Sequence, residues 1–414
     1  MAFEHIVSGI DVGNSHVKVV VAKVSRELEK PEVVGAGRAP SNGIRRGTVV
    51  DMEEAIESIR AAVQQAQAMA QMPIRRAYLS INGLHVQTQT SRGVIAVSRA
   101  DNEISQHDID RVLQAASVVS LPPNREIIHV LPRDFIVDGT EHVRNPLGMK
   151  GVRLEAEVCI IDGLSPYLRN ITKCVHENNI EVAGLVYAPL AASLAALDKS
   201  QREFGVLHLD FGGGTSSMAI FEEADLVHSA MFPIGSRHIT NDLAIALRTS
   251  MDVAEQIKLE HGATSEGEDL RRRENIDLTA ALGEDFVIPR KQLIRVVDAR
   301  IDELVEMVGA ELKKVSRSGT LPAGIVLSGG GANLPGLLAV MKERLRLPVR
   351  LAKPVHVGGV LEVVADPSYV VAVGLALWGI EQELGGTRQK TSQTFARSGG
   401  LLGKVSDWLK NFMP

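Results

Sequence analysis

Aromatic side chains and clustered positive charge are both scarce in this chain of 414 residues. Phe, Trp and Tyr make up only 4% of the sequence, which leaves few rings for the base-stacking surfaces of single-stranded nucleic-acid binders. The formal net charge is −5, and no long basic stripe occurs ahead of the C-terminal tail. Because nucleic-acid binders carry a basic footprint, we expect no nucleic-acid partner.

Cysteines and long apolar runs are also rare. Cys159 and Cys174 stand apart in apolar surroundings without a Cys-x-x-Cys spacing, which is typical of buried thiols and fits a reducing cytoplasm. The longest uncharged stretch, residues 182–197, is shorter than the roughly 20 residues that a membrane-spanning helix needs. The first residues lack a basic region ahead of an apolar run, so we expect neither a secretory leader nor a transmembrane helix.

Glycine, in contrast, is concentrated in three turns that each follow a short apolar strand: residues 11–15, 210–215 and 328–332. Glycine lets a backbone approach an anion closely with successive N–H groups pointing at it, as in phosphate cradles. One such turn would be an ordinary hairpin loop. Three in this order predict a nucleotide-binding protein.

The first two turns belong to a repeated pattern. Strand-like residues 6–10 and 17–24 flank the first turn, residues 206–209 and 218–221 flank the second, and each first strand ends at an aspartate. A chain of this length needs more than one domain, so we expect two related α/β halves facing each other across a cleft. Asp11 and Asp210 would then lie near the β- and γ-phosphates, where Mg²⁺ with its own waters would relieve their repulsion.

Helical periodicity is clearest in residues 52–72, 106–118 and 289–319. Pro289 opens the last of these helices and Gly319 ends it. The block between the first two turns mixes strands and helices without a glycine cradle of its own, and it is interpreted as an inserted subdomain. No Walker A sequence, nucleophile elbow or zinc-binding helix occurs, and no residue stands out as a catalytic acid or base.

The C-terminus changes character after residue 384. Residues 385–398 are polar without an apolar period and are expected to form a flexible tether. In the segment that follows, the apolar side chains fall in one helical arc; they are Leu401, Leu402, Val405, Trp408, Leu409, Phe412 and Met413. Basic residues around this arc favour an anionic membrane surface. A terminal helix that packs on its own domain is the alternative.

The three turns resemble the phosphate-1, phosphate-2 and adenosine motifs of the actin, Hsp70 and sugar kinase superfamily. Within it, residues 127–132, 137–139, 146–149 and 153–155 look like the inserted 1C subdomain of the bacterial division family FtsA. Residues 239–243 and 254–258 are similar to that family's second half. The resemblance covers nearly the whole chain.

This resemblance implies an α/β, actin/Hsp70-like two-lobed ATPase fold with an inserted 1C subdomain and a C-terminal amphipathic helix. The expected subdomains are 1A (1–86, 163–200 and 366–384), 1C (87–162), 2A (201–243 and 321–365), 2B (244–320), a linker (385–398) and a membrane-targeting helix (399–413).

It also implies ATP with Mg²⁺ in the cleft. The positions that match the family's nucleotide contacts are Asp11, Gly13, Asn14, Ser15, Lys18, Asp210, Gly212, Gly213, Gly214, Thr215, Gly329, Gly330 and Gly331, with Glu255 and Lys258 at the ribose or adenine. Asp11 and Asp210 would hold the metal through water.

The implied partners are other copies of the chain in protofilaments, an anionic membrane, further division proteins and the C-terminal peptide of the tubulin-like FtsZ. Arg295 and Arg300 in subdomain 2B are candidates for that peptide, although a solvated helix face would look the same. The expected location is the cytoplasmic face of the cell membrane at the division site.

One position departs from the superfamily. Ser217 stands where phosphate-2 motifs often carry an aspartate, so we expect slow ATP hydrolysis at most. The alternative functions are a small-molecule kinase, which would need a carboxylate base in the cleft, and a pilus-assembly adaptor on the same fold. A chaperone-like ATPase would need a substrate-binding β-domain after the last turn, and none is evident.

Overall fold

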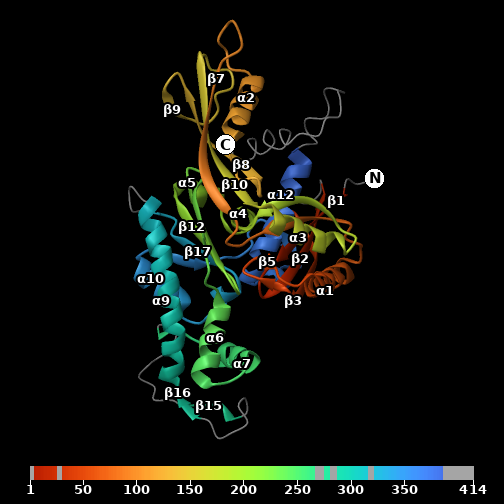
Figure 1. The fold of residues 1–414 in the computed structure, drawn as a ribbon, viewed down its shortest axis with the longest axis vertical. Helices are drawn as coiled ribbons and strands as arrows, with labels where there is room; N and C mark the ends of the chain where they lie inside the picture. Colours follow the sequence, from red (N-terminus) through yellow and green to blue (C-terminus); the bar gives the residue numbers. More distant parts are fainter. Residues whose placement is uncertain (1–3, 26–29, 266–274, 280–286, 316–320, 386–414) are drawn as a thin grey trace.

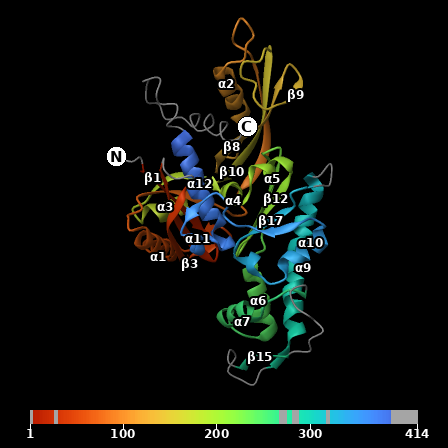
Figure 2. The same ribbon diagram turned by 180° about the vertical axis from the view of Figure 1, so that it is seen from behind.

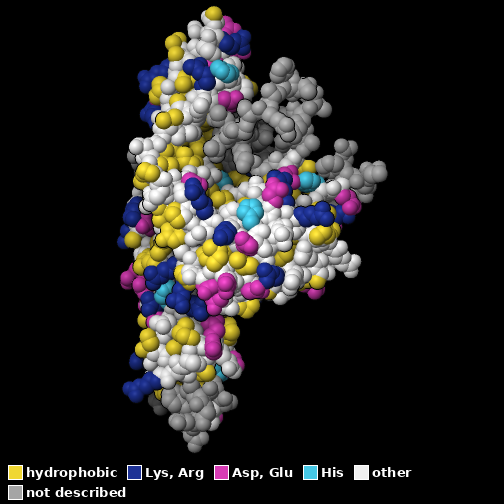
Figure 3. Space-filling model, turned by 45° about the vertical axis from the view of Figure 1, so that its right-hand side comes forward, with side chains coloured by type: hydrophobic (Ala, Val, Ile, Leu, Met, Phe, Trp, Pro, Cys, Tyr) yellow, Lys and Arg dark blue, Asp and Glu magenta, His cyan; other side chains and the backbone are white. Residues whose placement is uncertain are grey.

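The computed structural model describes residues 4–25, 30–265, 275–279, 287–315 and 321–385. Two lobes lie side by side, a small insert projects from one end, and a helical extension of the second lobe forms the other end (Figure 1). On the face drawn in Figure 3, basic and acidic side chains lie interspersed.

Lobe 1 is built on a six-stranded sheet with the order β11-β6-β1-β2-β3-β19. Antiparallel pairing joins β1 to β2 and β2 to β3, whereas β6, β11 and β19 pair in parallel. The strands are β1 (Glu4–Val12), β2 (His16–Ser25), β3 (Glu32–Pro40), β6 (Arg76–Ile81), β11 (Glu181–Tyr187) and β19 (Gly358–Gly359).

Helices cover both faces of this sheet, which explains why β1 and β2 are apolar along most of their length. One face carries α1 (Met52–Ala70) and α3 (Ser165–His176), and the other carries α4 (Ala188–Ala196) and α12 (Val370–Gly385). The side chain of Asp51 caps α1 by accepting a hydrogen bond from the Glu54 N–H. A short hairpin, β4 (Ile44–Arg45) and β5 (Thr48–Val49), precedes that cap.

Lobe 2 repeats the hairpin on a five-stranded sheet with the order β14-β13-β12-β17-β18. Its strands are β12 (Val206–Phe211), β13 (Ser216–Glu222), β14 (Asp225–Phe232), β17 (Ile325–Ser328) and β18 (Val349–Leu351). The helical extension contains α6 (Ser236–Leu247), α7 (Met251–His261), α9 (Arg290–Val315) and the strands β15 (Asn275–Asp277) and β16 (Val287–Pro289). The remaining short helices are α5 (Lys199–Phe204), α10 (Leu337–Leu345), α11 (Leu361–Val364) and two 3₁₀ turns, Gly330–Asn333 and Pro367–Tyr369.

The insert is a four-stranded antiparallel sheet with one helix, α2 (Gln106–Ser117), on one face. Its strands are β7 (Gln87–Ala96), β8 (Arg125–Val137), β9 (Thr140–Val143) and β10 (Arg153–Leu164). A buried cluster of its own, including Val112, Ala116 and Leu154, holds it together. The insert also touches lobe 2, since Arg144 bonds Glu203 with both terminal guanidinium nitrogens at 3.1 Å.

A shared core joins the lobes. Both views of the ribbon show α4 and α12 lying between the two sheets (Figures 1 and 2). One apolar cluster extends from lobe 1 through these helices to Val206 and Val326 in lobe 2. Every residue of α4 is buried, so a buried helical layer lies between the two lobes.

The sequence-based elements are found at their expected places. The predicted helices over 52–72 and 106–118 are α1 and α2, and the helix that Pro289 opens is α9. The block interpreted as an inserted subdomain forms its own sheet, whose strands β7 and β8 carry polar as well as apolar residues. Gly319 and residues 386–414, which include the predicted tether and membrane helix, lie outside the described residues. None of the described helices combines the length and apolar character required to cross a membrane.

The α4–α12 contact provides a stability test. A Cβ at Gly374 would overlap the backbone carbonyl oxygen of Ala191, whereas one at Gly309 in α9 would meet only Leu345 Cδ2, at 3.6 Å. We predict that Gly374→Ala destabilises the protein by about 1–3 kcal/mol, and that Gly309→Ala stabilises it by about 0.5–1 kcal/mol. Urea unfolding measures both. Equal stabilisation by the two substitutions would contradict the close helix contact.

Candidate nucleotide-binding site

The two aspartate-led turns meet at the junction of the lobes. Asn14 Nδ2 in the first turn donates a hydrogen bond to Thr215 Oγ1 in the second, at 3.2 Å. A Cβ at Gly213 would lie 2.6 Å from Ser15 Cβ, so only glycine allows the turns to approach this closely. The loops of two hairpins that are far apart in sequence therefore form one continuous surface.

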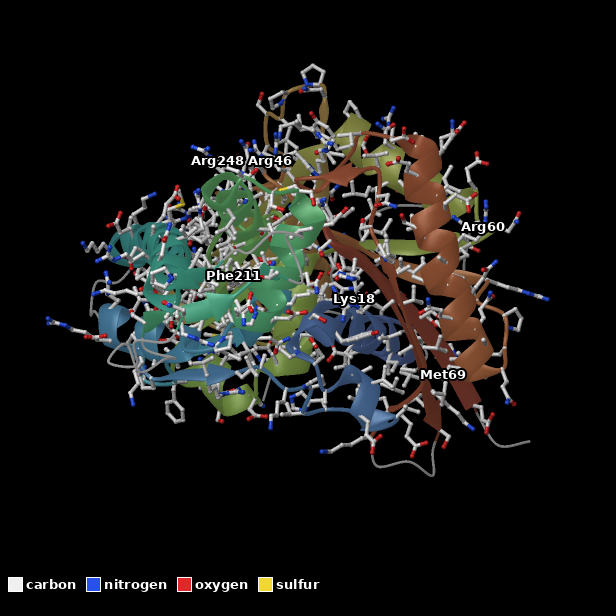
Figure 4. All side chains as sticks on the ribbon, turned by 90° about the horizontal axis from the view of Figure 1, so that it is seen from below. Lys18, Arg46, Arg60, Met69, Phe211 and Arg248 are labelled. Carbon is white, nitrogen blue, oxygen red and sulfur yellow. The ribbon has the colours of Figure 1, made fainter. Side chains whose placement is uncertain are left out.

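Asp11 and Asp210 occupy equivalent places, each one residue before the end of its strand. A serine from the neighbouring parallel strand orients each carboxylate: Ser80 Oγ donates to Asp11 Oδ1 at 2.8 Å, and Ser328 Oγ donates to Asp210 Oδ2 at 2.7 Å. Lys18 Nζ lies 3.8 Å from Asp11 Oδ2, and Figure 4 shows Lys18 between the lobes. Each carboxylate is thus held by its own lobe and faces the cleft.

The electrostatics of this pair favour a cation. Burial, together with the charge of Asp11, raises the pKa of Asp210 to about 6, although the hydrogen bond from Ser328 and the charge of Lys18 act in the opposite direction. Two carboxylates facing one cleft repel each other, and a bound cation would relieve that repulsion.

The residues present fit a hydrated Mg²⁺. Magnesium prefers oxygen ligands and keeps several waters, using one or two carboxylates together with phosphate oxygens. Within the described ranges, one oxygen of Asp210 accepts a protein hydrogen bond and the other accepts none, which leaves it available. No group of three potential metal-binding side chains occurs within the described residues, so the ion would be held by this pair, water and phosphate.

The third turn forms the opposite wall of the cleft. Gly329 has a φ of +88°, a conformation that favours glycine, and a Cβ at Gly330 would meet no protein atom within 4 Å. From α7, Lys258 Nζ donates to Glu255 Oε2 at 2.7 Å and to Thr240 Oγ1 at 2.9 Å. Burial opposes ionisation of Glu255, but these hydrogen-bond partners hold its pKa below the usual range.

The structure brings all of the predicted nucleotide-binding residues except Gly214 to one cleft. Its lining includes Asp11, Gly13, Asn14, Ser15, Lys18, Asp210, Gly212, Gly213, Thr215, Glu255, Lys258, Gly329, Gly330 and Gly331. Gly214 instead lines a neighbouring groove on the other side of the Asn14 side chain. Arg295 and Arg300 lie elsewhere, on α9.

Sequence reasoning missed several lining residues, including His16, Arg38 and Leu259. Burial and then the charges of Arg38 and Lys18 lower the pKa of His16 to about 4, so its ring is neutral at physiological pH. Leu259 is 75% exposed, unusual for a leucine, and provides an apolar surface at the cleft. No motif contains these residues, although Leu259 directly follows Lys258.

Two family models match this chain. A family described as "SHS2 domain inserted in FTSA" matches residues 83–162, and one described as "Cell division protein FtsA" matches residues 207–374. The chain is 35% identical to the cell division protein FtsA of Pseudomonas aeruginosa over 99% of this chain and 97% of that protein. It is 36% identical to the Bacillus subtilis protein over 88% and 81%, and 30% identical to the Escherichia coli K12 protein over 98% and 97%.

Two solved structures have folds similar to that of this chain. The PilM-PilN type IV pilus biogenesis complex is similar with a TM-score of 0.65 and 16% identity, covering 91% of this chain and 98% of that one. MreB 5 of Spiroplasma citri bound to AMPPNP is similar with a TM-score of 0.56 and 13% identity, covering 94% and 99%. These neighbours confirm the actin-like two-lobed fold expected from the sequence.

A substitution at Gly330 can test nucleotide binding separately from the stability of the fold. Leucine at this position would fill the cleft without displacing protein atoms, because the space around its Cβ is open. We predict that Gly330→Leu weakens Mg·ATP binding at least about tenfold, since the side chain takes space that a bound nucleotide needs, and leaves the melting temperature unchanged. The control is Gly358→Leu, whose Cβ meets only Glu32 Cγ at 3.7 Å. Calorimetry and thermal melting distinguish the two, and unchanged affinity in Gly330→Leu would place the nucleotide elsewhere.

Proposed function

This chain belongs to the FtsA family of cell division proteins, and we propose that it binds ATP between its lobes and polymerises on the inner face of the cytoplasmic membrane. There it would anchor the FtsZ ring at the division site. The observation that carries the proposal is the convergence of three glycine-rich turns and two opposed aspartates on one interlobe cleft. We also propose the subdomain division given above.

The nucleotide would be held mainly by backbone amides of the three turns, with Mg²⁺ between Asp11 and Asp210. Ser217 is 3% exposed and lies in β13 opposite Asp210, so the usual carboxylate beyond the second turn is replaced by a buried hydroxyl. Slow hydrolysis at most is therefore expected. Bound nucleotide would serve chiefly to hold the two lobes in one arrangement that can polymerise.

A small-molecule kinase has less support. Among the described residues, the carboxylates that line the cleft are Asp11, Asp210 and Glu255. Each already accepts a hydrogen bond from Ser80, Ser328 or Lys258 respectively. A general base must reach the substrate hydroxyl. Asp11 and Asp210 are instead held at the aspartate-led turns, and Glu255 is held on α7.

The proposed FtsZ site is a groove along α9 and α6, where Arg295 and Arg300 play different parts. Arg300 binds both oxygens of Asp242, Nε to Oδ2 at 2.8 Å and Nη2 to Oδ1 at 2.9 Å, and also contacts Glu303. Arg295 is exposed and lines the same groove, and it has no ion-pair partner in the described part of the chain. An acidic peptide would therefore pair first with Arg295, while Arg300 shapes the groove.

The proposed membrane anchor follows α12, whose C-terminal end is bonded to the sheet of lobe 1. Near the end of α12, Glu383 accepts hydrogen bonds from Tyr78 at 3.2 Å and Arg76 at 3.1 Å and contacts His5, so α12 is tied to the sheet of lobe 1. The amphipathic segment follows through the tether. Seven partly buried apolar side chains would contribute about 1 kcal/mol each, which does not exceed the cost of about 1 kcal/mol per residue for ordering about thirteen residues, so a single copy should bind lipid weakly. Joining many copies in a filament would raise the avidity steeply.

Membrane attachment should therefore be cooperative. We predict that sedimentation with anionic liposomes rises steeply with protein concentration and further with Mg·ATP, because filaments multiply a weak contact. Trp408→Glu should abolish lipid binding while leaving nucleotide affinity unchanged. A flat concentration dependence, or liposome binding by a chain lacking residues 385–414, would contradict the proposed anchor.

The two arginines should respond differently to substitution. We predict that Arg295→Ala weakens binding of the FtsZ C-terminal peptide about tenfold through loss of a charge-assisted hydrogen bond, without changing the melting temperature. Arg300→Ala leaves Asp242 unpaired, so it should also lower the melting temperature. Fluorescence anisotropy of a labelled peptide, with Arg60→Ala in α1 as control, tests this difference. Normal peptide affinity in Arg295→Ala would remove this side chain from the site.

A further inference from the structure

A second groove lies directly behind the wall of the nucleotide cleft. Asn14 is 8% exposed and lines both cavities. Its side chain is fixed on two sides: Nδ2 donates to Thr215 Oγ1 at 3.2 Å, and Oδ1 accepts from the Gly47 N–H at 2.8 Å. A Cβ on Gly214 would lie 2.9 Å from Asn14 Cβ, so this glycine allows the wall to close. The two cavities are neighbours separated by one side chain and a glycine.

The second groove is lined from both lobes by basic side chains. Lobe 1 contributes Arg45 and Arg46 from the β4–β5 hairpin, and lobe 2 contributes Arg237 and His238 from the first turn of α6. All three arginines are exposed. In the portion of the chain that the structure describes, none of the three has an ion-pair partner, although most of the other arginines with defined positions are paired.

The hairpin holds Arg46 in place. Arg46 and Gly47 have φ values of +50° and +76°, as in the type I′ turn that closes a two-residue hairpin between Arg45 and Thr48. Arginine is not favoured at positive φ, so this conformation of Arg46 carries some conformational cost. The hydrogen bond from Gly47 to Asn14 then fixes this hairpin tip against the first phosphate turn.

Like charges that face each other across a groove repel unless an anion lies between them. Arginine's planar fork suits tetrahedral and planar oxyanions, which it can bind with two parallel hydrogen bonds. The neighbouring Asn241 adds an exposed amide from α6. No Asp or Glu is among the described residues that line the groove, so its lining offers the arginines no negative charge.

We propose that this groove is a second anion site that takes a phosphoryl group, separate from the nucleotide and in contact with both lobes. A phosphoryl group, rather than a carboxylate, is favoured because arginine forks from opposite lobes and the Asn241 amide together offer more donors, from more directions, than the two oxygens of a carboxylate can accept. Arg46 and Arg237 are its principal ligands, one from each lobe. The assignment rests on the proposed interlobe nucleotide only for the position of the neighbouring phosphates.

The test titrates inorganic phosphate into the full chain saturated with Mg·AMPPNP, followed by calorimetry. We expect phosphate binding to persist with the cleft filled. Arg46→Gln and Arg237→Gln should each weaken it about tenfold or more, with AMPPNP affinity within about threefold of the unsubstituted chain. The control is Arg60→Gln, a half-buried arginine on α1 that pairs with Glu57 and that Figure 4 shows well away from Arg46.

Two further arms identify the ligand. Glycerol 3-phosphate binding as well as inorganic phosphate would assign the site to phosphoryl end groups, whereas binding of phosphate alone would assign it to the free ion. A hexaglutamate peptide that binds more tightly than either would overturn the phosphoryl assignment in favour of an acidic partner. Complete competition between phosphate and AMPPNP, or unchanged phosphate affinity in both variants, would overturn the site itself.

Failure of the proposed function gives a different result. A chain that binds phosphate in an Arg46-dependent way but gives no heat with Mg·AMPPNP would retain the second site and lose the nucleotide site. A chain that binds Mg·AMPPNP normally and shows no phosphate binding would retain the nucleotide site and lose the second one. Thermal melting of each variant confirms that it is folded.

Discussion

The contact between the two aspartate-led turns, residues 11–15 and 210–215, is the constraint on which the rest of the site depends. Asn14 bonds Thr215 across the lobe boundary, and Gly213 gives Ser15 room to approach. Behind this contact, Ser80 and Ser328 aim one aspartate from each lobe into the same cleft. Because the facing carboxylates repel each other, a cation bound between the lobes would relieve that repulsion.

A shared apolar core that contains α4 and α12 connects the two lobes behind this contact. Helix α4 is buried along its whole length, and α12 approaches it closely at Gly374. The insert is covalently part of lobe 1 yet reaches lobe 2 through Arg144 and Glu203.

The sequence alone predicts the residues whose chemistry is carried by a local pattern. Asp11 and Asp210 each follow an apolar strand and precede glycines, so spacing was enough to place them together. Ser80 and Ser328 could not be assigned this way, because their role comes from parallel strands beside β1 and β12. The same holds for the groove formed by Arg46 and Arg237, which depends on a hairpin tip meeting a helix of the other lobe. Gly214 shows where a local pattern is not sufficient. It belongs to a turn with the composition of a phosphate cradle, but it lines the second groove instead of the nucleotide cleft.

The most direct test of this account is anomalous diffraction from crystals of the full chain grown with Mn²⁺·AMPPNP. The account predicts one manganese peak between Asp11 and Asp210, bound through water, with the triphosphate on the three glycine-rich turns. A nucleotide bound outside the interlobe cleft, or a metal peak remote from both aspartates, would contradict it.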